Sequence, residues 1–290
     1  MRRFALVNEA GARRDISTAP GVWLDQPTGL GVSLSPVMAD YYHGFFAAVS
    51  ADAEPQGSIY GDLVFSRRGR AYEDYRELVD WIMAAGSLEL IYIPYGSTEY
   101  HRAVTVTVAE KGELDQVGWL RVPVTLVCLT PWYRPIQQSV ALVPVASAAM
   151  RYPYAYTPSL VYASSNVGNM AADVTASGHQ AASVALTYTG ALTNPTIRLE
   201  GPGGALLGSC ALTADLAEGD RLEYSSRPLA SYVRKIAADG TETDLLPTVD
   251  LSSDPFLRIP TGQGCRLSLT SQAAIAGTAE LRIYEYYRSV

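Results

Sequence analysis

The sequence predicts a mainly β protein with two domains, of which the first carries one helix and the second is a β-sandwich. Strand-like segments, rich in β-branched and aromatic residues, recur along the chain. Only one segment, in the first half, has apolar residues at helical spacing. In the second half, strands and turns alternate at intervals of roughly eight to twelve residues, the spacing typical of a sandwich. A length of 290 residues, 48% of them hydrophobic, is enough for one large or two ordinary cores.

Three strands are predicted around the helix in the first half. The first is Gly57–Phe65, with β-branched and aromatic residues between glycines, and the polar turn Arg67–Arg70 follows it. The apolar run Leu88–Ile93 is the second, and Pro94 ends it. The third, Ala103–Val108, alternates with a period of two residues, as a strand with one buried face does.

One short amphipathic helix is predicted between the turn and the second strand. Glu73, Glu77 and Asp80 form its polar face, and Gly86 supplies the stop. The apolar residues recur at three- and four-residue spacing and comprise Tyr72, Tyr75, Leu78, Val79, Ile82 and Met83.

The composition changes between Thr130 and Tyr156, where prolines and small residues become frequent. We therefore predict a domain boundary near residue 140, with domains at 1–140 and 141–290. The tripeptide Pro131–Tyr133, just before it, is interpreted as a core plug that ends the first domain. Strands predicted beyond the boundary are Ser183–Thr189, Asn194–Glu200, Arg221–Tyr224, Tyr232–Ile236, Cys265–Leu269 and Ala279–Tyr286.

The charge balance disfavours nucleic acid as a ligand, because 29 acidic against 22 basic residues give a formal net charge of −7. Only 18% of residues are charged, whereas 19 are tyrosine, a composition that suits surfaces buried against partners. The start of the chain lacks a signal-peptide core. The longest apolar stretch, Val140–Met150, is too short for a membrane helix. The thiols of Cys128, Cys210 and Cys265 lie far apart and are interpreted as structural.

No catalytic, cofactor or metal site is predicted. The three histidines, His43, His101 and His179, stand outside any catalytic or metal-ligand motif. Gly57–Gly61 does not have the spacing of a nucleophile elbow. Gly201–Gly204 is flanked by strands, so a hairpin turn is favoured over a phosphate-binding loop.

A series of short segments occurs in a characteristic order along nearly the whole chain. In the first half these are Phe4–Asn8, Gly11, Pro27–Gly31, Gly61–Phe65, Tyr72, Tyr75, Leu88–Pro94, Tyr100, Glu113, Gly118, Leu120 and Pro131–Tyr133. In the second half they are Gly190, Asn194–Ile197, Gly219–Leu222, Ile259–Gly262 and Ile283–Arg288. In this order the chain resembles the distal tail proteins of long-tailed bacteriophages, a siphovirus-type tail component family.

The resemblance implies a split-barrel-like N-terminal domain with one helix, followed by a galectin-like β-sandwich. It also implies a non-enzymatic subunit of the virion, assembled in the host cytoplasm, whose N-terminal domains form a ring, expected to be hexameric. The implied partners are further copies of the chain, the tail tube protein and a tail-tip hub or tail-associated lysin-type protein. The tape measure protein and receptor-binding proteins are further candidates.

Two other functions remain open from the sequence. The stronger is a carbohydrate-binding adhesin, in which exposed tyrosines of the second domain stack against sugars; the alternative for these tyrosines is packing at the domain junction and in the sandwich core. A polysaccharide hydrolase ranks below it. The candidate glycan contacts are Tyr152, Tyr154, Tyr156, Tyr162 and Tyr188.

Trp81 is the candidate subunit contact. It lies outside the stripe formed by the apolar residues of its helix, so its indole either faces a neighbouring subunit or is covered by a loop of its own domain. The sequence favours neither possibility.

Overall fold

The computed structural model describes residues 2–18, 21–42, 45–136, 143–144, 169–252, 254–273, 275 and 277–290. The chain divides into two compact units, Met1–Arg134 with Tyr286–Val290, and Pro135–Glu285. The boundary predicted near residue 140 lies outside the described residues, and the domains at 1–140 and 141–290 stay a prediction.

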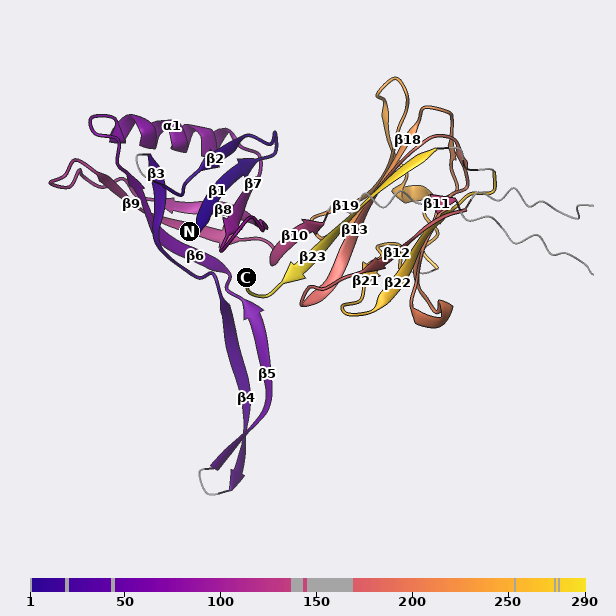
Figure 1. The fold of residues 1–290 in the computed structure, drawn as a ribbon, viewed down its shortest axis with the longest axis horizontal. Coiled ribbons are helices and arrows are strands. Elements are labelled where there is room, and N and C mark those ends of the chain that lie inside the picture. Colours follow the sequence, from indigo (N-terminus) through magenta and orange to yellow (C-terminus); the bar gives the residue numbers. More distant parts are fainter. Residues whose placement is uncertain are drawn as a thin grey trace, which may run out of the picture. The chain divides into compact units, whose positions relative to one another are not determined.

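The body of the first unit is an antiparallel barrel (Figure 1). β3 pairs with β6, β6 with β9, β9 with β8, β8 with β7, β7 with β1, and β1 with β2. Ile16, just past β2, joins the two ends, because its N–H donates to the Phe4 carbonyl (3.0 Å) and its carbonyl accepts from the Leu24 N–H (3.0 Å). The strands are β1 (Arg3–Asn8), β2 (Arg13–Asp15), β3 (Val22–Thr28), β6 (Ser58–Phe65), β7 (Leu88–Ile93), β8 (Tyr100–Ala109), β9 (Leu120–Cys128) and β10 (Trp132–Ile136).

A long two-stranded ribbon, formed by β4 (Val32–Tyr42) and β5 (Phe45–Pro55), projects from the barrel (Figure 1). The two strands pair only with each other among the described strands. Gly29 stands at the entry with φ +88°, and a Cβ there would overlap the Ser58 carbonyl oxygen, so only glycine fits. The sequence analysis did not predict this ribbon.

The helix α1 (Ala71–Ala84) covers one side of the barrel and buries Ala71, Asp74 and Leu78 (Figure 1). The Glu9 carboxylate accepts from the N–H groups of Gly86 (3.0 Å) and Ser87 (3.1 Å), just beyond the helix end. The helix was predicted correctly, and of its predicted apolar residues Leu78 is buried while Tyr72, Tyr75 and Ile82 pack against the core. Met83, assigned to the apolar face, is 79% exposed, because it falls on the side of the helix that points away from the barrel.

The second unit is a sandwich of two main antiparallel sheets. One sheet contains β13 (Gln180–Thr189), β18 (Arg221–Arg227), β19 (Ala230–Ile236), β20 (Glu242–Asp244), β21 (Arg258–Ile259) and β23 (Thr278–Tyr287). The other contains β11 (Val143–Pro144), β12 (Asn169–Thr175), β15 (Thr196–Glu200), β16 (Leu206–Ala211) and β22 (Gly264–Thr270). A small pair is formed by β14 (Leu192–Thr193) and β17 (Asp215–Leu216), and the short 3-10 turns are Pro202–Gly204 and Leu246–Thr248.

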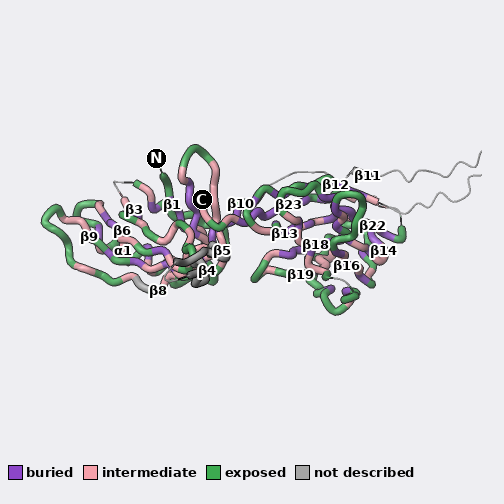
Figure 2. Tube along the Cα trace, turned by 90° about the horizontal axis from the view of Figure 1, so that it is seen from below, coloured by how far each residue is buried: buried purple, intermediate pink, exposed green. Residues whose placement is uncertain are grey.

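Each unit has its own apolar core, and Figure 2 shows buried residues inside both. In the second unit, alternate residues of facing strands fill the space between the sheets, such as Leu186, Tyr224, Leu267 and Leu281. The mainly β fold with one α-helix in the described part is confirmed. Of the three thiols, Cys210 and Cys265 are buried and Cys128 is half-buried, and none forms a disulfide.

Candidate functional site

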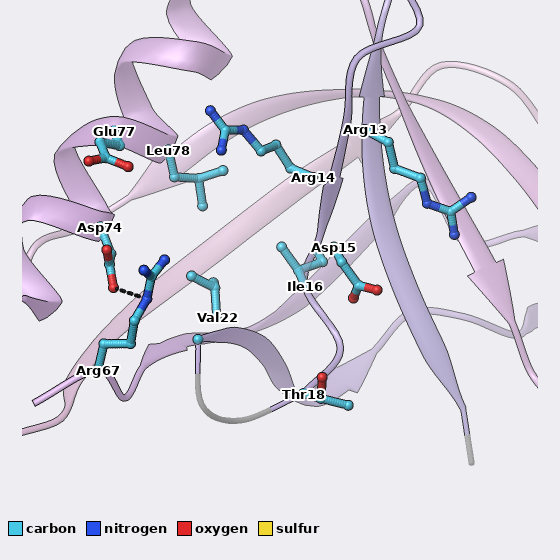
Figure 3. A pocket seen from close by; sticks show the side chains of 11 residues that line it. Arg13, Arg14, Asp15, Ile16, Thr18, Val22, Arg67, Asp74, Glu77 and Leu78 are labelled. Carbon is cyan, nitrogen blue, oxygen red and sulfur yellow. Dashed lines mark ion pairs between the residues drawn. The ribbon is translucent and has the colours of Figure 1, made fainter.

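A polar cavity of about 410 Å³ opens between α1 and the segments around β2 and β3 (Figure 3). We call it the helix-side cavity. The side chains that matter most for its chemistry are Arg14, Ile16, Val22, Arg67, Asp74 and Leu78. Ile16, Val22 and Leu78 make one part of the lining apolar, while Asp74 and Arg67 face it with charge.

Asp74 is the buried charge of this cavity. It lies in the first turns of α1 at the same helical stripe as Ala71 and Leu78, so the barrel covers it and leaves its side chain only 2% exposed. The Arg67 Nε lies 2.9 Å from Asp74 Oδ2. Neither carboxylate oxygen has a well-aligned hydrogen-bond donor among the described residues, and both oxygens have almost no accessible surface. Such unsatisfied acceptors are costly in an otherwise satisfied interior.

Arg14 connects the cavity to Trp81. Its guanidinium carbon lies 5.9 Å from the centre of the Trp81 ring, in a cation–π arrangement. Trp81 is half-buried and packs against the first-unit core. The candidate subunit contact therefore lies beside the helix-side cavity, on the same helix as Asp74, and part of its surface stays accessible.

A second cluster, the ribbon clamp, consists of Arg102 and Trp132 at the base of the β4–β5 ribbon. The Arg102 guanidinium, on a residue only 2% exposed, donates to the carbonyls of Thr130 (2.7 Å) and Gln56 (2.6 Å). The fully buried Trp132 donates through Nε1 to the Leu30 carbonyl (3.3 Å), and its ring lies 5.4 Å from the guanidinium carbon of Arg102. Both ends of the ribbon are thus held by one stacked pair.

The charge of Arg102 has no carboxylate partner among the described residues, and its Nη1 has no acceptor there. Burial lowers the pKa of this guanidinium below its ordinary value. The interpretation of Pro131–Tyr133 as a core plug agrees with the complete burial of Trp132.

The candidate glycan contacts are not brought together in the described part of the chain. Tyr152, Tyr154, Tyr156 and Tyr162 lie outside the described residues. Tyr188 has no exposed surface, because it faces the sandwich core, so its ring offers no face to a sugar. For Tyr188 the alternative interpretation, core packing, is the one the fold supports.

His101 belongs to a polar network on the first unit. His101 Nδ1 lies 3.3 Å from Glu89 Oε2, and Glu89 also accepts a hydrogen bond from the Tyr133 hydroxyl. The described residues contain no group of three or more metal-ligating side chains placed to hold an ion. His43 is outside the described residues. No helix in the described ranges is long and apolar enough to cross a membrane.

A sequence model of the distal tail protein N-terminal domain matches residues 3–129, nearly the whole chain segment of the first unit. Residues 3–129 are therefore similar to the N-terminal domain of distal tail proteins, and the resemblance drawn from the sequence is confirmed for the first unit. A search of curated protein sequences gave no match.

Two solved structures are similar to this chain in fold. A chain of the phage p2 baseplate in its activated conformation with Sr has a TM-score of 0.69 and 14% identity, covering 100% of both chains. The Dit protein of phage SPP1, described as a paradigm of the hub adsorption apparatus in phages that infect Gram-positive bacteria, has a TM-score of 0.54 and 10% identity. It covers 97% of this chain and 98% of its own. At such identities these matches show the fold.

Two residues of this chain that sequence reasoning missed carry the polar chemistry of the first unit. Asp74 stands three residues after Ala71 and four before Leu78, so an acid on the helix's inner stripe was visible in the spacing. Arg102 stands two residues before Val104, on the inner face of an alternating strand. In both cases the spacing of the apolar residues puts a charged residue on the buried face of its helix or strand. This pattern is the signal that could have identified both residues.

Proposed function

We propose that this chain is a distal tail protein, a structural subunit that forms a ring, expected to be hexameric, between the tail tube and the tail-tip hub. The observation that supports the proposal is the match of the distal tail family model to residues 3–129, since these residues build the barrel. In this role the first unit makes the ring and the second unit is peripheral. The proposed partners are the tail tube protein, a tail-tip hub or lysin-type protein and further copies of the chain. The tape measure protein and receptor-binding proteins are further proposed partners.

Ring closure gives a physical role to the strand edges of the β4–β5 ribbon, whose strands pair only with each other among the described strands. Unpaired strand edges invite uncontrolled pairing, and a cyclic head-to-tail arrangement satisfies each edge with that of a neighbour. Trp81 is the proposed contact, because a half-buried indole gains most when a neighbour covers the rest of it. The proposed role is assembly in the virion and not catalysis.

Sedimentation and negative-stain imaging of the full chain, mixed with the tail tube protein where needed for closure, test the ring. We expect closed rings, and Trp81→Ala should weaken assembly by about 2 kcal/mol or more per interface. Leu229→Ala is the matched control, because Leu229 is 79% exposed and lies in the second unit. A chain that stays monomeric with the tube protein at high concentration would contradict the ring. Equal assembly of the Trp81→Ala variant would remove only Trp81 from the interface.

The non-enzymatic role has its own test. Purified protein incubated with cell-wall polysaccharide should release no reducing ends. Fragment release that a single Asp or Glu substitution abolishes would show a hydrolase instead.

A further inference from the structure

We propose that a second cavity, at the base of the β4–β5 ribbon, binds a neutral saccharide. We call it the ribbon-base groove. Its volume of about 550 Å³ lies within the range of about 300 to 1,000 Å³ that small-molecule sites occupy. This binding goes beyond the ring role, because the first unit of one copy of the chain builds the whole groove. The polar and aromatic side chains that line it are Thr28, Ser33, Glu54, Gln56, Ser58 and Tyr60.

Strand pairing arranges these side chains as two walls. On the barrel side, Thr28 of β3 lies directly opposite Tyr60 of β6, and Ser58 shares the face of Tyr60 because it stands two residues earlier in the same strand. On the ribbon side, Ser33 of β4 lies directly opposite Glu54 of β5. Side chains of directly opposed residues are neighbours on one face, so each wall presents its polar groups together.

The joint between the two walls is held by the ribbon clamp. Trp132 donates to the Leu30 carbonyl where the chain enters the ribbon, and Arg102 donates to the Gln56 carbonyl where the chain returns. The Gln56 N–H also donates to the Gly31 carbonyl (3.3 Å), which ties the two connections to each other. A groove whose walls are fixed before the ligand arrives loses less conformational entropy on binding.

The lining offers one aromatic face and several hydrogen-bonding groups. Tyr60 is 54% exposed, so its ring provides a surface on which a sugar ring can stack. The other polar side chains of the groove are exposed or half-buried. Their hydroxyl, amide and carboxylate groups include both donors and acceptors, and each hydroxyl of a sugar both donates and accepts. Stacking and hydrogen bonding are thus both available to a saccharide in this groove.

Other ligands fit the groove less well. Among the described residues that line it there is no arginine, lysine or histidine, so an anion meets no cation. Glu54 is the one carboxylate there, and the described part of the chain has no group of three or more metal-ligating side chains. A cationic side chain would pair with Glu54 but would leave the hydroxyl donors without acceptors, since ammonium and guanidinium groups accept no hydrogen bond.

A glycan array tests the proposal, with the full chain as the labelled probe and calorimetric titration of each sugar that binds. The array carries the hexoses, N-acetylhexosamines and deoxyhexoses of bacterial surfaces. We expect saturable binding of at least one sugar, weakened about tenfold or more in Tyr60→Ala, which removes the stacking surface. Tyr95→Ala is the matched control, because Tyr95 is 85% exposed in the same unit and does not line the groove. That variant should bind as the parent chain does.

Glu54→Gln tests the ribbon wall separately. It keeps the shape of the side chain but replaces a charge-assisted hydrogen bond by a neutral one, so binding should weaken by about three- to tenfold. Glu73→Gln, an exposed carboxylate on α1, is its control. Absence of binding to every sugar of the array, unchanged binding in a folded Tyr60→Ala variant, or tighter binding of lysine amide or acetate than of any sugar would each overturn the proposal. A chain that binds the sugar but forms no ring contradicts the ring alone.

Discussion

The helix-side cavity and the ribbon clamp place charges of opposite sign inside the same barrel, and each charge has polar atoms without a hydrogen-bond partner. Among the residues described, these atoms are both carboxylate oxygens of Asp74 and Nη1 of Arg102. The surroundings differ. Asp74 lines a cavity of about 410 Å³, whereas Arg102 uses its other nitrogens on two backbone carbonyls and stacks on Trp132.

This difference teaches how to interpret an unsatisfied buried atom. The Asp74 oxygens have almost no accessible surface, so a ligand in the cavity does not reach them, and the Arg67 guanidinium is the charge that faces them. Where the remaining groups of the same side chain hold several segments together, the unsatisfied atom accompanies a structural role. We therefore infer a structural clamp at Arg102 and, at Asp74, an ion pair that ties α1 to the turn before it.

The largest effect is expected from a substitution of Trp132, the aromatic residue of the ribbon clamp. Trp132→Ala removes a fully buried indole and the donor to the Leu30 carbonyl, so we expect a loss of about 3 to 5 kcal/mol in the unfolding free energy of the first unit. Denaturant unfolding followed by the remaining tryptophans measures it. A loss below about 1 kcal/mol would show that Trp132 is not part of a packed core.

The next largest effect is expected from a substitution of Arg102, the charged residue of the ribbon clamp. Arg102→Met keeps an apolar stem but leaves the carbonyls of Gln56 and Thr130 without their donor, at about 1 to 3 kcal/mol for each group left buried. At the ribbon base the Gln56 N–H donates to the Gly31 carbonyl (3.3 Å) and the Cys128 N–H to the Gly57 carbonyl (2.9 Å). Hydrogen exchange at these two amides should become faster by about ten- to a hundredfold.

Arg121→Met is the control for this measurement, because Arg121 is a half-exposed barrel arginine that pairs with Asp25 at 3.0 Å. Exchange at the ribbon base should not change in this variant. If both variants give the same exchange pattern, the clamp does not hold the ribbon.

The sequence predicted those strands and turns whose residue pattern depends only on neighbouring positions in the chain. Leu88–Ile93 coincides with β7, because a continuous apolar run needs only its own residues to show burial on both faces. Asp239 and Gly240, a dipeptide typical of hairpin turns, lie between β19 and β20, and Gly240, at φ +88°, adopts the backbone conformation that such turns require.

The ribbon could not be predicted in the same way. Pro36 lies within β4, and a proline normally argues against a strand, but in a two-stranded ribbon every strand is an edge and the missing donor is tolerated. The helix-side cavity could not be predicted for a related reason. The spacing places Asp74 on the inner stripe, but whether that stripe meets a packed core or a cavity depends on β2 and β3, which are distant in sequence.

The smallest effect is expected from a comparison of Asp74 with Asp220, a buried carboxylate whose two oxygens both accept hydrogen bonds. Asp220, in the second unit, accepts from Lys235 Nζ (2.7 Å) and from the N–H groups of Ala217 (2.8 Å) and Ala238 (3.2 Å). The hydrogen bond from Lys235, and then that from Ala217, lower the pKa of Asp220 below its ordinary value. At neutral pH, Asp220→Asn should therefore lower the melting temperature more than Asp74→Asn.

The pH dependence gives this comparison a direction. Because the folded state lowers the pKa of Asp220, its contribution to stability is fully present above the ordinary carboxyl pKa, about 3.9, and is lost as the pH falls through the lower folded value. The melting curves of the parent chain and Asp220→Asn should differ at pH 7 and converge toward pH 2. Asp74→Asn removes the ion pair to the half-exposed Arg67, and we expect its melting temperature at pH 7 to fall less than that of Asp220→Asn, which loses a cation and two backbone donors. A larger loss at pH 7 in Asp74→Asn than in Asp220→Asn would contradict this order.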